Sequence, residues 1–360
     1  MAADAKTVVA LGGEGIGPEV VDATCEVLMA AGVPLRILTP PHGEAAHRAH
    51  GSPLPEETKR LCREADGVLF GAAGGPSTSA VVAWLRWEQR AYAGVRPVKY
   101  YPGASSPLRN PDGIDFVVLR ENTEGLYPGR EGDLADLARV LPGLKDRTGR
   151  RIADYGGAGR FAVKVVTAAG SERIARFACE LARRRQARGR PGKVTCVTKS
   201  NVLKQSDGLF QEIAEKTVRG AGLAWEHFHV DDASRRLIRF PQSMDVVLCM
   251  NLYGDILSDL AGELAGGLGM APSANFGEGW AYFESVHGSA PDIAGKGIAN
   301  PTATLLSASL MLDHMGLPAD AARLEAAVAR VYREGRARTA DQGGLATTKE
   351  FCQAVVTALG

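Results

Sequence analysis

The sequence predicts an α/β protein built on a mainly parallel sheet, and three observations support this prediction. Short apolar runs that suit buried parallel strands alternate along the chain with longer amphipathic stretches that suit helices. At 360 residues the chain is too long for one small core, so we expect two domains. A content of 45% hydrophobic and 23% charged residues is typical of an ordinary soluble globular protein.

The first half of the chain shows the alternation in order. Glycine and proline enrich residues 71–76 and predict a loop there. Pro97 biases Arg96 away from the helical region, which favours an extended segment around it. The expected elements are a strand at 7–11, a helix at 18–31, a strand at 67–70, a helix at 79–93, an extended segment at 95–101 and a strand at 116–119.

The second half continues the pattern after an irregular region. Polar and apolar residues alternate over 152–167 around Gly156-Gly157-Ala158-Gly159, which predicts a hairpin-like arm. A helix at 172–188 ends in basic residues, as the helix dipole favours. Strands follow at 193–198 and 245–250, and the second leads through a turn at 251–254 into a further helix.

The overall charge and the apolar runs exclude several classes of function. A net charge of +1 favours neither a nucleic acid nor a membrane surface as partner, and no apolar run is long enough to span a membrane. Residues 1–6 lack a signal-peptide pattern, so we expect a cytoplasmic protein. The six cysteines form no CxxC pair, which predicts reduced and mostly buried thiols.

The glycine-rich segment at 12–18 joins a strand to a helix but does not match a Rossmann fingerprint. Counted as GxGxxG from Gly13, the last glycine position is occupied by Pro18. Glu14 would also place a negative charge where a pyrophosphate should bind. The simpler interpretation is a tight turn that closes on a helix with proline near its start.

Asp255 and Asp259 stand four residues apart on the helix that follows the strand at 245–250. That spacing puts both carboxylates on one helix face, at the carboxyl end of a strand where open α/β sheets bind ligands. Paired carboxylate oxygens suit a hard divalent cation such as Mg²⁺ or Mn²⁺. For two acids alone, a helix N-terminus stabilised by its dipole would be the better interpretation.

Five segments together resemble one family. The segment His287–Thr302 resembles the cofactor loop of the isocitrate/isopropylmalate dehydrogenase family, whose members are metal-dependent β-decarboxylating dehydrogenases acting on isocitrate, homoisocitrate, 3-isopropylmalate, tartrate or D-malate. The segment Asn251–Asp259 resembles its metal motif. The segments that resemble its substrate motifs are Leu85-Arg86 with Val95-Arg96-Pro97, Leu119–Tyr127 and Thr198–Asn201. The resemblance covers nearly the whole chain.

The resemblance implies a two-domain fold of this family with a dimer arm, rather than a Rossmann fold. Residues 1–95 and 267–360 would form the large cofactor-binding domain, and residues 96–266 the small domain for substrate, metal and dimerisation. It also implies a homodimer in which each site is shared, with Lys199 and Asp231 coming from the other subunit. The arm near 152–166 would be exchanged between the subunits.

The resemblance assigns a role to each candidate residue. Arg86, Arg96 and Arg120 would hold substrate carboxylates, which arginine grips in bidentate fashion, although each alone is more simply a surface arginine. Lys199 would accept the C2 hydroxyl proton, and Tyr127 would return a proton to C3 after decarboxylation. The metal would be bound by Asp231, Asp255 and Asp259, with Asp232 as a lower-ranked rival for Asp231. The residues implied in cofactor binding are His287, Gly288, Ala290, Asp292, Ile293 and Asn300.

Asp292 favours NAD, because an acid accepts hydrogen bonds from an unmodified ribose but repels a 2′-phosphate. The helix before Arg86 bears on the substrate. Isocitrate enzymes of the family carry serine and asparagine where this chain has Ala80 and Val82. Isopropylmalate enzymes carry glutamate and two leucines where it has Ser79, Val82 and Ala83. The wall formed by residues 80–84 is small and apolar, and Trp84 and Trp87 would narrow the pocket, so the wall disfavours a bare third carboxylate.

The pocket therefore favours a malate with a small or apolar C3 group, or a tartrate or D-malate. The segments at 204–210 and 302–306 are instead closer to NAD-dependent isocitrate enzymes, so isocitrate and homoisocitrate stay open as substrates. A non-catalytic regulatory subunit is a further alternative. It is disfavoured because the catalytic set is complete, and a Rossmann 2-hydroxyacid dehydrogenase is disfavoured by the missing glycine fingerprint.

Overall fold

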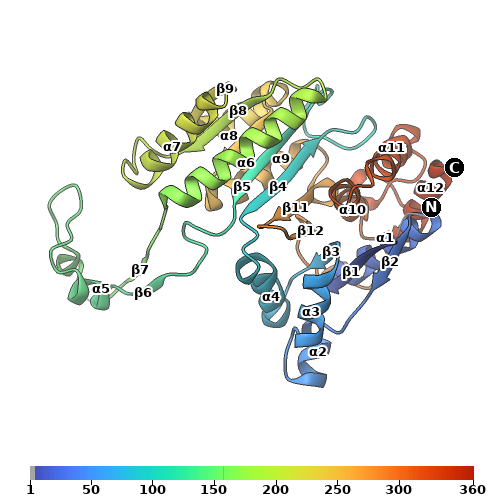
Figure 1. The fold of residues 1–360 in the computed structure, drawn as a ribbon, viewed down its shortest axis with the longest axis horizontal. Helices are drawn as coiled ribbons and strands as arrows, with labels where there is room; N and C mark the ends of the chain where they lie inside the picture. The colour runs from blue at the N-terminus through green and yellow to red at the C-terminus, as the bar shows by residue number, and fades with distance from the viewer. Residues whose placement is uncertain (1–4, 157) are drawn as a thin grey trace.

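The computed structural model describes residues 5–156 and 158–360. Over these residues, ten strands form one continuous sheet in the order β2-β1-β3-β12-β11-β4-β5-β10-β8-β9 (Figure 1). The strands of this sheet are β1 Lys6–Gly13, β2 Leu35–Leu38, β3 Gly67–Ala72, β4 Ala93–Lys99, β5 Asp115–Glu121, β8 Lys193–Thr198, β9 Ala224–His229, β10 Val246–Cys249, β11 Pro272–Phe276 and β12 Ala281–Ser285. Among the described strands six neighbouring pairs are parallel, and the three antiparallel pairs lie together at β12-β11-β4-β5. The sheet is therefore mainly parallel, as predicted.

The helices cover both faces of this sheet. They are α1 Gly17–Ala30, α2 Gly43–His50, α3 Glu56–Glu64, α4 Pro76–Ala83, α5 Leu134–Val140, α6 Ala168–Ala187, α7 Ser206–Gly220, α8 Val230–Arg239, α9 Asn251–Leu264, α10 Thr302–His314, α11 Pro318–Glu334 and α12 Thr348–Leu359. Shorter helical turns are η1 Trp84–Glu88, η2 Ile152–Tyr155, η3 Pro241–Ser243, η4 Leu268–Met270 and η5 Ala340–Gln342. Among the described residues no helix is long and apolar enough to cross a membrane.

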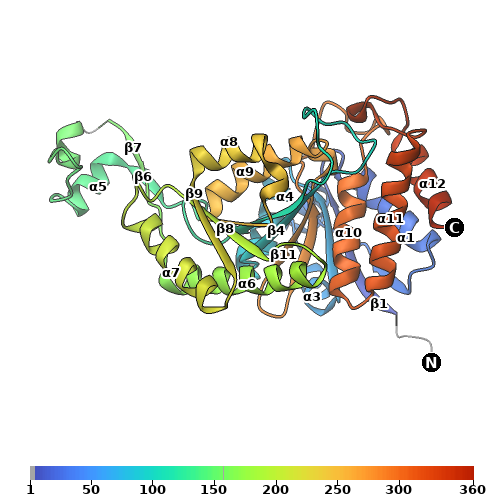
Figure 2. The ribbon, with the colours of Figure 1, turned by 90° about the horizontal axis from the view of Figure 1, so that it is seen from above.

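Alternating strand residues divide the core between the two faces. On one face Val117 and Leu119 join a large cluster that includes residues of α1, α6, α7 and α10. On the other face Val118 packs with α8 and α9, while Val9 and Val68 belong to a separate cluster with α3, α4 and η1. Figure 2 shows α8 and α9 on one side of the sheet and α6 and α7 on the other. The second face thus carries two separate cores, one under α8 and α9 and one under α3, α4 and η1.

Two local predictions of secondary structure were wrong. The helix expected at 79–93 ends earlier, because Arg90 takes a positive φ of 51° and Ala93 already belongs to β4. The turn expected at 251–254 is the first turn of α9, since the Gly254 N–H donates to the Met250 carbonyl at 2.8 Å. The cysteine prediction is confirmed, because all six thiols are free and buried.

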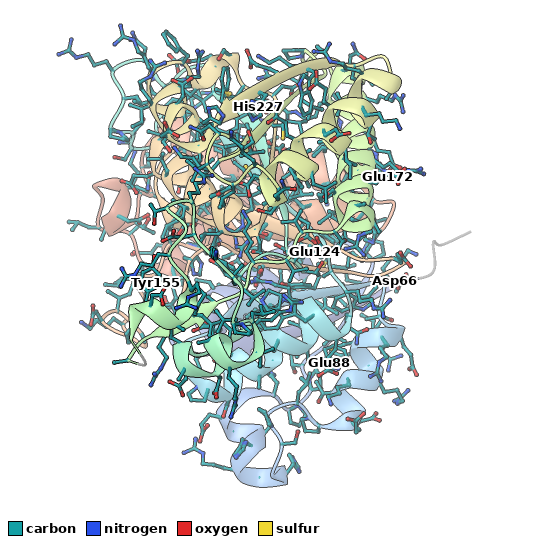
Figure 3. All side chains as sticks on the ribbon, turned by 90° about the vertical axis from the view of Figure 1, so that its left-hand side faces the viewer. Asp66, Glu88, Glu124, Tyr155, Glu172 and His227 are labelled. Atoms are coloured by element: carbon teal, nitrogen blue, oxygen red, sulfur yellow. The ribbon has the colours of Figure 1, made fainter. Side chains whose placement is uncertain are left out.

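The hairpin expected within residues 152–167 was also wrong, although an arm is present. Strand β7 (Arg160–Ala162) pairs with β6 (Glu131–Asp133) rather than with a segment inside 152–167. Gly157 of the predicted turn lies outside the described residues. The strand pair carries α5 and η2 away from the body, and Figure 3 looks from the side of this arm, with Tyr155 labelled. The predicted domain boundary near residues 95 and 96 falls inside β4 and stays a prediction.

Candidate active site

Two of the predicted arginines project from the central antiparallel strands onto the same face. Arg96 on β4 shares its side of the strand with Val98, and Arg120 on β5 shares its side with Val118. Both valines belong to the core under α8 and α9. Arg86 reaches toward this region from η1, next to the other core. The three arginines predicted from sequence therefore meet between the two cores.

Arg86 is held by a buried polar network on β12 and β11. Its guanidinium donates to the Glu284 carboxylate at 3.1 Å and to the Tyr282 hydroxyl at 3.3 Å. Glu284 also accepts a hydrogen bond from Asn275 at 3.1 Å. Burial opposes the charge on Arg86, but Tyr282 and Glu284 outweigh it and raise its pKa above the ordinary value. The predicted site lacked Tyr282 and Glu284, which lie 196 and 198 residues from Arg86 in the sequence.

Arg120 is almost completely enclosed, with 1% of its surface exposed. Its Nε and Nη2 donate to the Asn251 side-chain oxygen at 2.9 and 2.6 Å, and its Nη1 donates to Asp255. Burial and the repulsion of Arg96 and Arg86 lower the pKa of Arg120 to about 10. Gly254 allows α9 to approach this closely, because a Cβ there would lie 2.8 Å from the Arg120 side chain.

Tyr127 joins the same cluster from the loop after β5. Its ring lies under the Arg120 guanidinium, with 4.6 Å between the ring centroid and the guanidinium carbon, and its hydroxyl donates to Asp255. Burial and the hydrogen bond to Asp255 raise the pKa of the Tyr127 phenol above its ordinary value. At neutral pH this hydroxyl is therefore protonated and is able to donate a proton.

The two acids of α9 lie on one face, as their spacing predicted. Arg96 donates to Ser258 at 2.5 Å and to Asp255 at 3.2 Å, and it lies 3.6 Å from Asp259. Burial opposes ionisation of Asp255, but Arg120 and Arg96 outweigh it and lower its pKa. Asp259 behaves differently, because burial and the charge of Asp255 raise its pKa despite Arg96. The two carboxylates lie close enough for the charge of Asp255 to oppose ionisation of Asp259. A divalent cation bound between them would remove that repulsion.

A single chain supplies only part of the predicted metal site. Asp231 follows β9, whereas the acids of α9 follow β10, two strands away in the sheet, which corresponds to about 10 Å at ~4.8 Å per strand. No group of three or more His, Cys, Asp or Glu that could hold a metal is present among residues 5–156 and 158–360. The carboxylate oxygens of Asp255 and Asp259 fit Mg²⁺ or Mn²⁺ in kind.

Lys199 and Asp231 form their own pair at the carboxyl ends of β8 and β9. The Lys199 ammonium donates to Asp231, whose side chain is 67% exposed. This hydrogen bond lowers the pKa of Asp231. The rival residue Asp232 is bound to Arg235 at 2.7 Å and to Arg236 at 2.6 Å on its own helix. The structure therefore leaves Asp231, rather than Asp232, paired with the candidate base.

The predicted cofactor loop packs against the glycine-rich turn at 12–17. The Ile16 N–H donates to the Ser289 carbonyl at 2.9 Å, and Gly15 has a φ of +61°. A Cβ at Gly15 would lie 1.9 Å from that carbonyl, so this close backbone approach requires glycine. The turn that failed the Rossmann pattern thus supports the loop at 287–297 instead.

The cofactor residues predicted from sequence fall into two groups. Asp292 and Gly288 are exposed and Ala290 is half-buried, while Ile293 packs against the small cluster of Ile16, Val20 and Ala299. The buried His287 Nε2 has no hydrogen-bond partner among the described residues. The Asn300 amide is engaged internally, since it donates to Asp341 at 2.9 Å and to Tyr332 at 3.3 Å.

The wall before Arg86 is small and largely apolar, as predicted. Val82 and Ala83 are half-buried, and Ser79 and Ala80 are exposed. Trp84, however, does not narrow this wall. It is 2% exposed and packs edge-on against Trp280, with 6.2 Å between ring centroids. Trp87 is 38% exposed and is the tryptophan available near Arg86.

Comparison with known proteins gives the family. The family model described as isocitrate/isopropylmalate dehydrogenase matches residues 7–355. The chain belongs to this family. It is therefore a dehydrogenase, an oxidoreductase, and the predicted family and its α/β fold are confirmed.

Individual relatives differ in the substrates that their names give. A 3-isopropylmalate/3-methylmalate dehydrogenase from Methanocaldococcus jannaschii is 44% identical over 95% of this chain and 96% of its own length. An isocitrate/homoisocitrate dehydrogenase from Thermus thermophilus is 42% identical over 96% of each chain. The solved structure of isocitrate dehydrogenase from Methylococcus capsulatus has a TM-score of 0.86 and 38% identity, and covers 98% of this chain and 99% of that one. The family is therefore established, and the substrate of this chain is not.

Proposed function

We propose that this protein catalyses the NAD-dependent oxidative decarboxylation of a 3-substituted malate, and that it needs Mg²⁺ or Mn²⁺. The observation that carries the proposal is the cluster of Arg86, Arg96, Arg120 and Tyr127 beside the carboxylates of α9. A cluster with three guanidinium groups and a protonated phenol suits a substrate that carries two carboxylates. Residence in the cytoplasm, expected from the sequence, belongs to the same proposal.

Each residue has a defined task in this reaction. The arginines hold the two carboxylates and so fix C2 and C3, while Lys199 of the partner subunit accepts the C2 hydroxyl proton. Bound NAD would supply the hydride acceptor for C2, and the divalent cation, which the aspartates would hold, would supply a Lewis acid for the C2 oxygen. The C3 carboxylate then leaves as CO₂, and Tyr127 donates its proton to C3.

The proposed substrate has a small or apolar C3 group, or is tartrate or D-malate. Val82 and Ala83 offer no hydrogen bond to a third carboxylate, and an unpaired buried charge is costly. The name of the Methanocaldococcus relative, which includes 3-methylmalate, agrees with this preference. Isocitrate and homoisocitrate are the second candidates, because the Thermus relative carries those names.

We infer that the active protein is a homodimer with shared sites. Lys199 and Asp231 pair with each other away from Asp255 and Asp259, so one chain does not bring the whole set together. The arm exposes apolar side chains that a partner would cover, because Val140, Leu141 and Leu144 are 71%, 48% and 46% exposed. Sedimentation that finds an active monomer would refute this part of the proposal.

NADH formation by the purified protein tests the function directly. Mn²⁺ or Mg²⁺ is supplied with 3-methylmalate, 3-isopropylmalate, D-malate, tartrate, isocitrate or homoisocitrate, with chelator and NADP as controls. We expect chelator-sensitive turnover of a 3-alkylmalate or of tartrate or D-malate. Preferred turnover of isocitrate would contradict the interpretation of Ala80 and Val82. Binding of NAD without turnover of any acid would favour a regulatory subunit.

A further inference from the structure

A buried carboxylate next to the candidate base has no role in the proposed mechanism. Asp207, in the first turn of α7, is 0% exposed. Its Oδ1 accepts hydrogen bonds from the Lys164 ammonium and, at 3.2 Å, from the Ser206 hydroxyl. Its Oδ2 accepts from the Lys199 backbone N–H at 2.8 Å and from the Tyr253 hydroxyl at 3.0 Å. Asp207 therefore joins the end of the arm, the end of β8 and α9.

The bond to Lys199 matters most, because of where β8 stops. Strand β8 pairs with β9 only up to Thr198, so the Lys199 N–H lies one residue past the ladder. In the structure this N–H donates to the Asp207 carboxylate. Tyr253 differs, since its backbone lies inside α9 and is held by the helix itself. Loss of the carboxylate would therefore leave the Lys199 N–H without its acceptor, so that this end of β8 shifts while α9 stays in place.

We propose that Asp207 is a positioning residue that fixes Lys199, the base of the proposed function, and so acts on the active site of the partner subunit. The inference rests on the shared site proposed above. A backbone held by a fully buried, charged acceptor keeps the lysine ammonium at one point beyond the strand end. A shift of about 1 Å in a reacting group is enough to lower a rate by about 100-fold.

The variant Asp207→Asn tests the proposal at one position. An amide has one acceptor oxygen and cannot accept from all four donors. We expect kcat to fall about 10- to 100-fold, with KM for the hydroxy acid and for NAD within about twofold. If Asp207→Asn does not fold, Asp207→Glu is used in its place, because it keeps the negative charge and moves the acceptor oxygens.

Two control variants separate positioning from folding. Asp245 is also 0% exposed and accepts from Arg185 at 2.5 Å and from the Lys193 N–H at 3.0 Å, but at the opposite end of β8. Asp245→Asn should lower the melting temperature and leave kcat of the folded protein unchanged. Ser206→Ala removes only the hydroxyl that donates to Asp207 Oδ1 and should also keep kcat. A loss of kcat in either control equal to that of Asp207→Asn would overturn the proposal.

Mixed dimers reveal which site Asp207 serves. An Asp207→Asn chain is co-expressed with a Tyr127→Phe chain. In the mixed dimer one site is fully intact, because it takes Tyr127 from the Asp207→Asn chain and Lys199 from the Tyr127→Phe chain, which keeps Asp207. Random pairing then restores about a quarter of wild-type activity. Co-expression of Asp207→Asn with Lys199→Ala should restore none, because both lesions act through the same lysine.

The proposal would be overturned if activity returned in the mixture of Asp207→Asn with Lys199→Ala but not in the mixture of Asp207→Asn with Tyr127→Phe. That result would mean that Asp207 acts on the site of its own chain. A third mixture, Lys199→Ala with Tyr127→Phe, tests the shared site independently of Asp207. If that mixture shows no restoration, the shared site itself has failed. If it shows restoration while Asp207→Asn keeps full kcat, only the positioning role has failed.

Discussion

Replacement of Arg120 by lysine tests whether the enclosed guanidinium binds substrate. A guanidinium has five N–H groups, and three of those of Arg120 are used on Asn251 and Asp255. Two remain, which is the number that one carboxylate accepts in a bidentate pair. Lysine has three N–H groups, so after it satisfies Asn251 and Asp255 one is left for the substrate.

The substitution therefore removes one charge-assisted hydrogen bond to the substrate and keeps the positive charge. Such a bond contributes about 1.5–3 kcal/mol, so kcat/KM for the hydroxy acid should fall about 10- to 150-fold. The assay is NADH formation at saturating NAD and metal, with KM for NAD measured alongside. Arg219→Lys on the surface of α7 is the matched control, because Arg219 is 62% exposed and pairs with Glu215 at 2.7 Å on its own helix. An unchanged kcat/KM in Arg120→Lys would refute substrate binding by this residue.

Three further predictions concern the cofactor, the acids and the pocket. Asp292→Lys should lower the ratio of kcat/KM for NAD over NADP by about tenfold or more, and an unchanged ratio would refute the ribose contact. Because arginines lower the pKa of Asp255 despite burial, its contribution to metal-free stability is present above pH ~3.9 and is lost as the pH falls through the folded pKa. The difference in urea stability between Asp255→Asn and wild type should therefore shrink from about pH 5 to pH 2, and a constant difference would contradict the pairing. The double change Ala80→Ser and Val82→Asn should raise isocitrate turnover about tenfold, through a charge-assisted hydrogen bond to the third carboxylate, and no gain would show that this wall does not select the substrate.

The α9 acids and the central arginines could be predicted because they depend on local geometry. Four-residue spacing places Asp255 and Asp259 on one helix face, and alternation along β5 turns Arg120 to one side of the sheet. The start of α9 was misjudged because Asn251 and Gly254 resemble a turn in sequence. Here they form the first helical turn, which brings Asn251 to Arg120. The family resemblance supplied the roles that spacing alone does not.

The partners of these residues could not be predicted, because they are distant in sequence. Glu284 lies 198 residues from Arg86, and a charged residue in a short apolar strand has no local signal for its partner. Asp207 and Trp84 illustrate the same limit. The first becomes a buried acceptor for Lys199, and the second packs into the core beside Trp280 instead of lining the pocket.

The ratio of CO₂ released to NADH formed tests the central claim most directly. The purified dimer is given Mn²⁺, NAD and the preferred acid of the substrate panel, and both products are measured in the same reaction. The proposed mechanism predicts equal amounts of CO₂ and NADH, and loss of both with chelator. NADH formed without CO₂ would contradict decarboxylation at this site, and turnover that survives chelator would contradict the role of Asp255 and Asp259 in binding the metal.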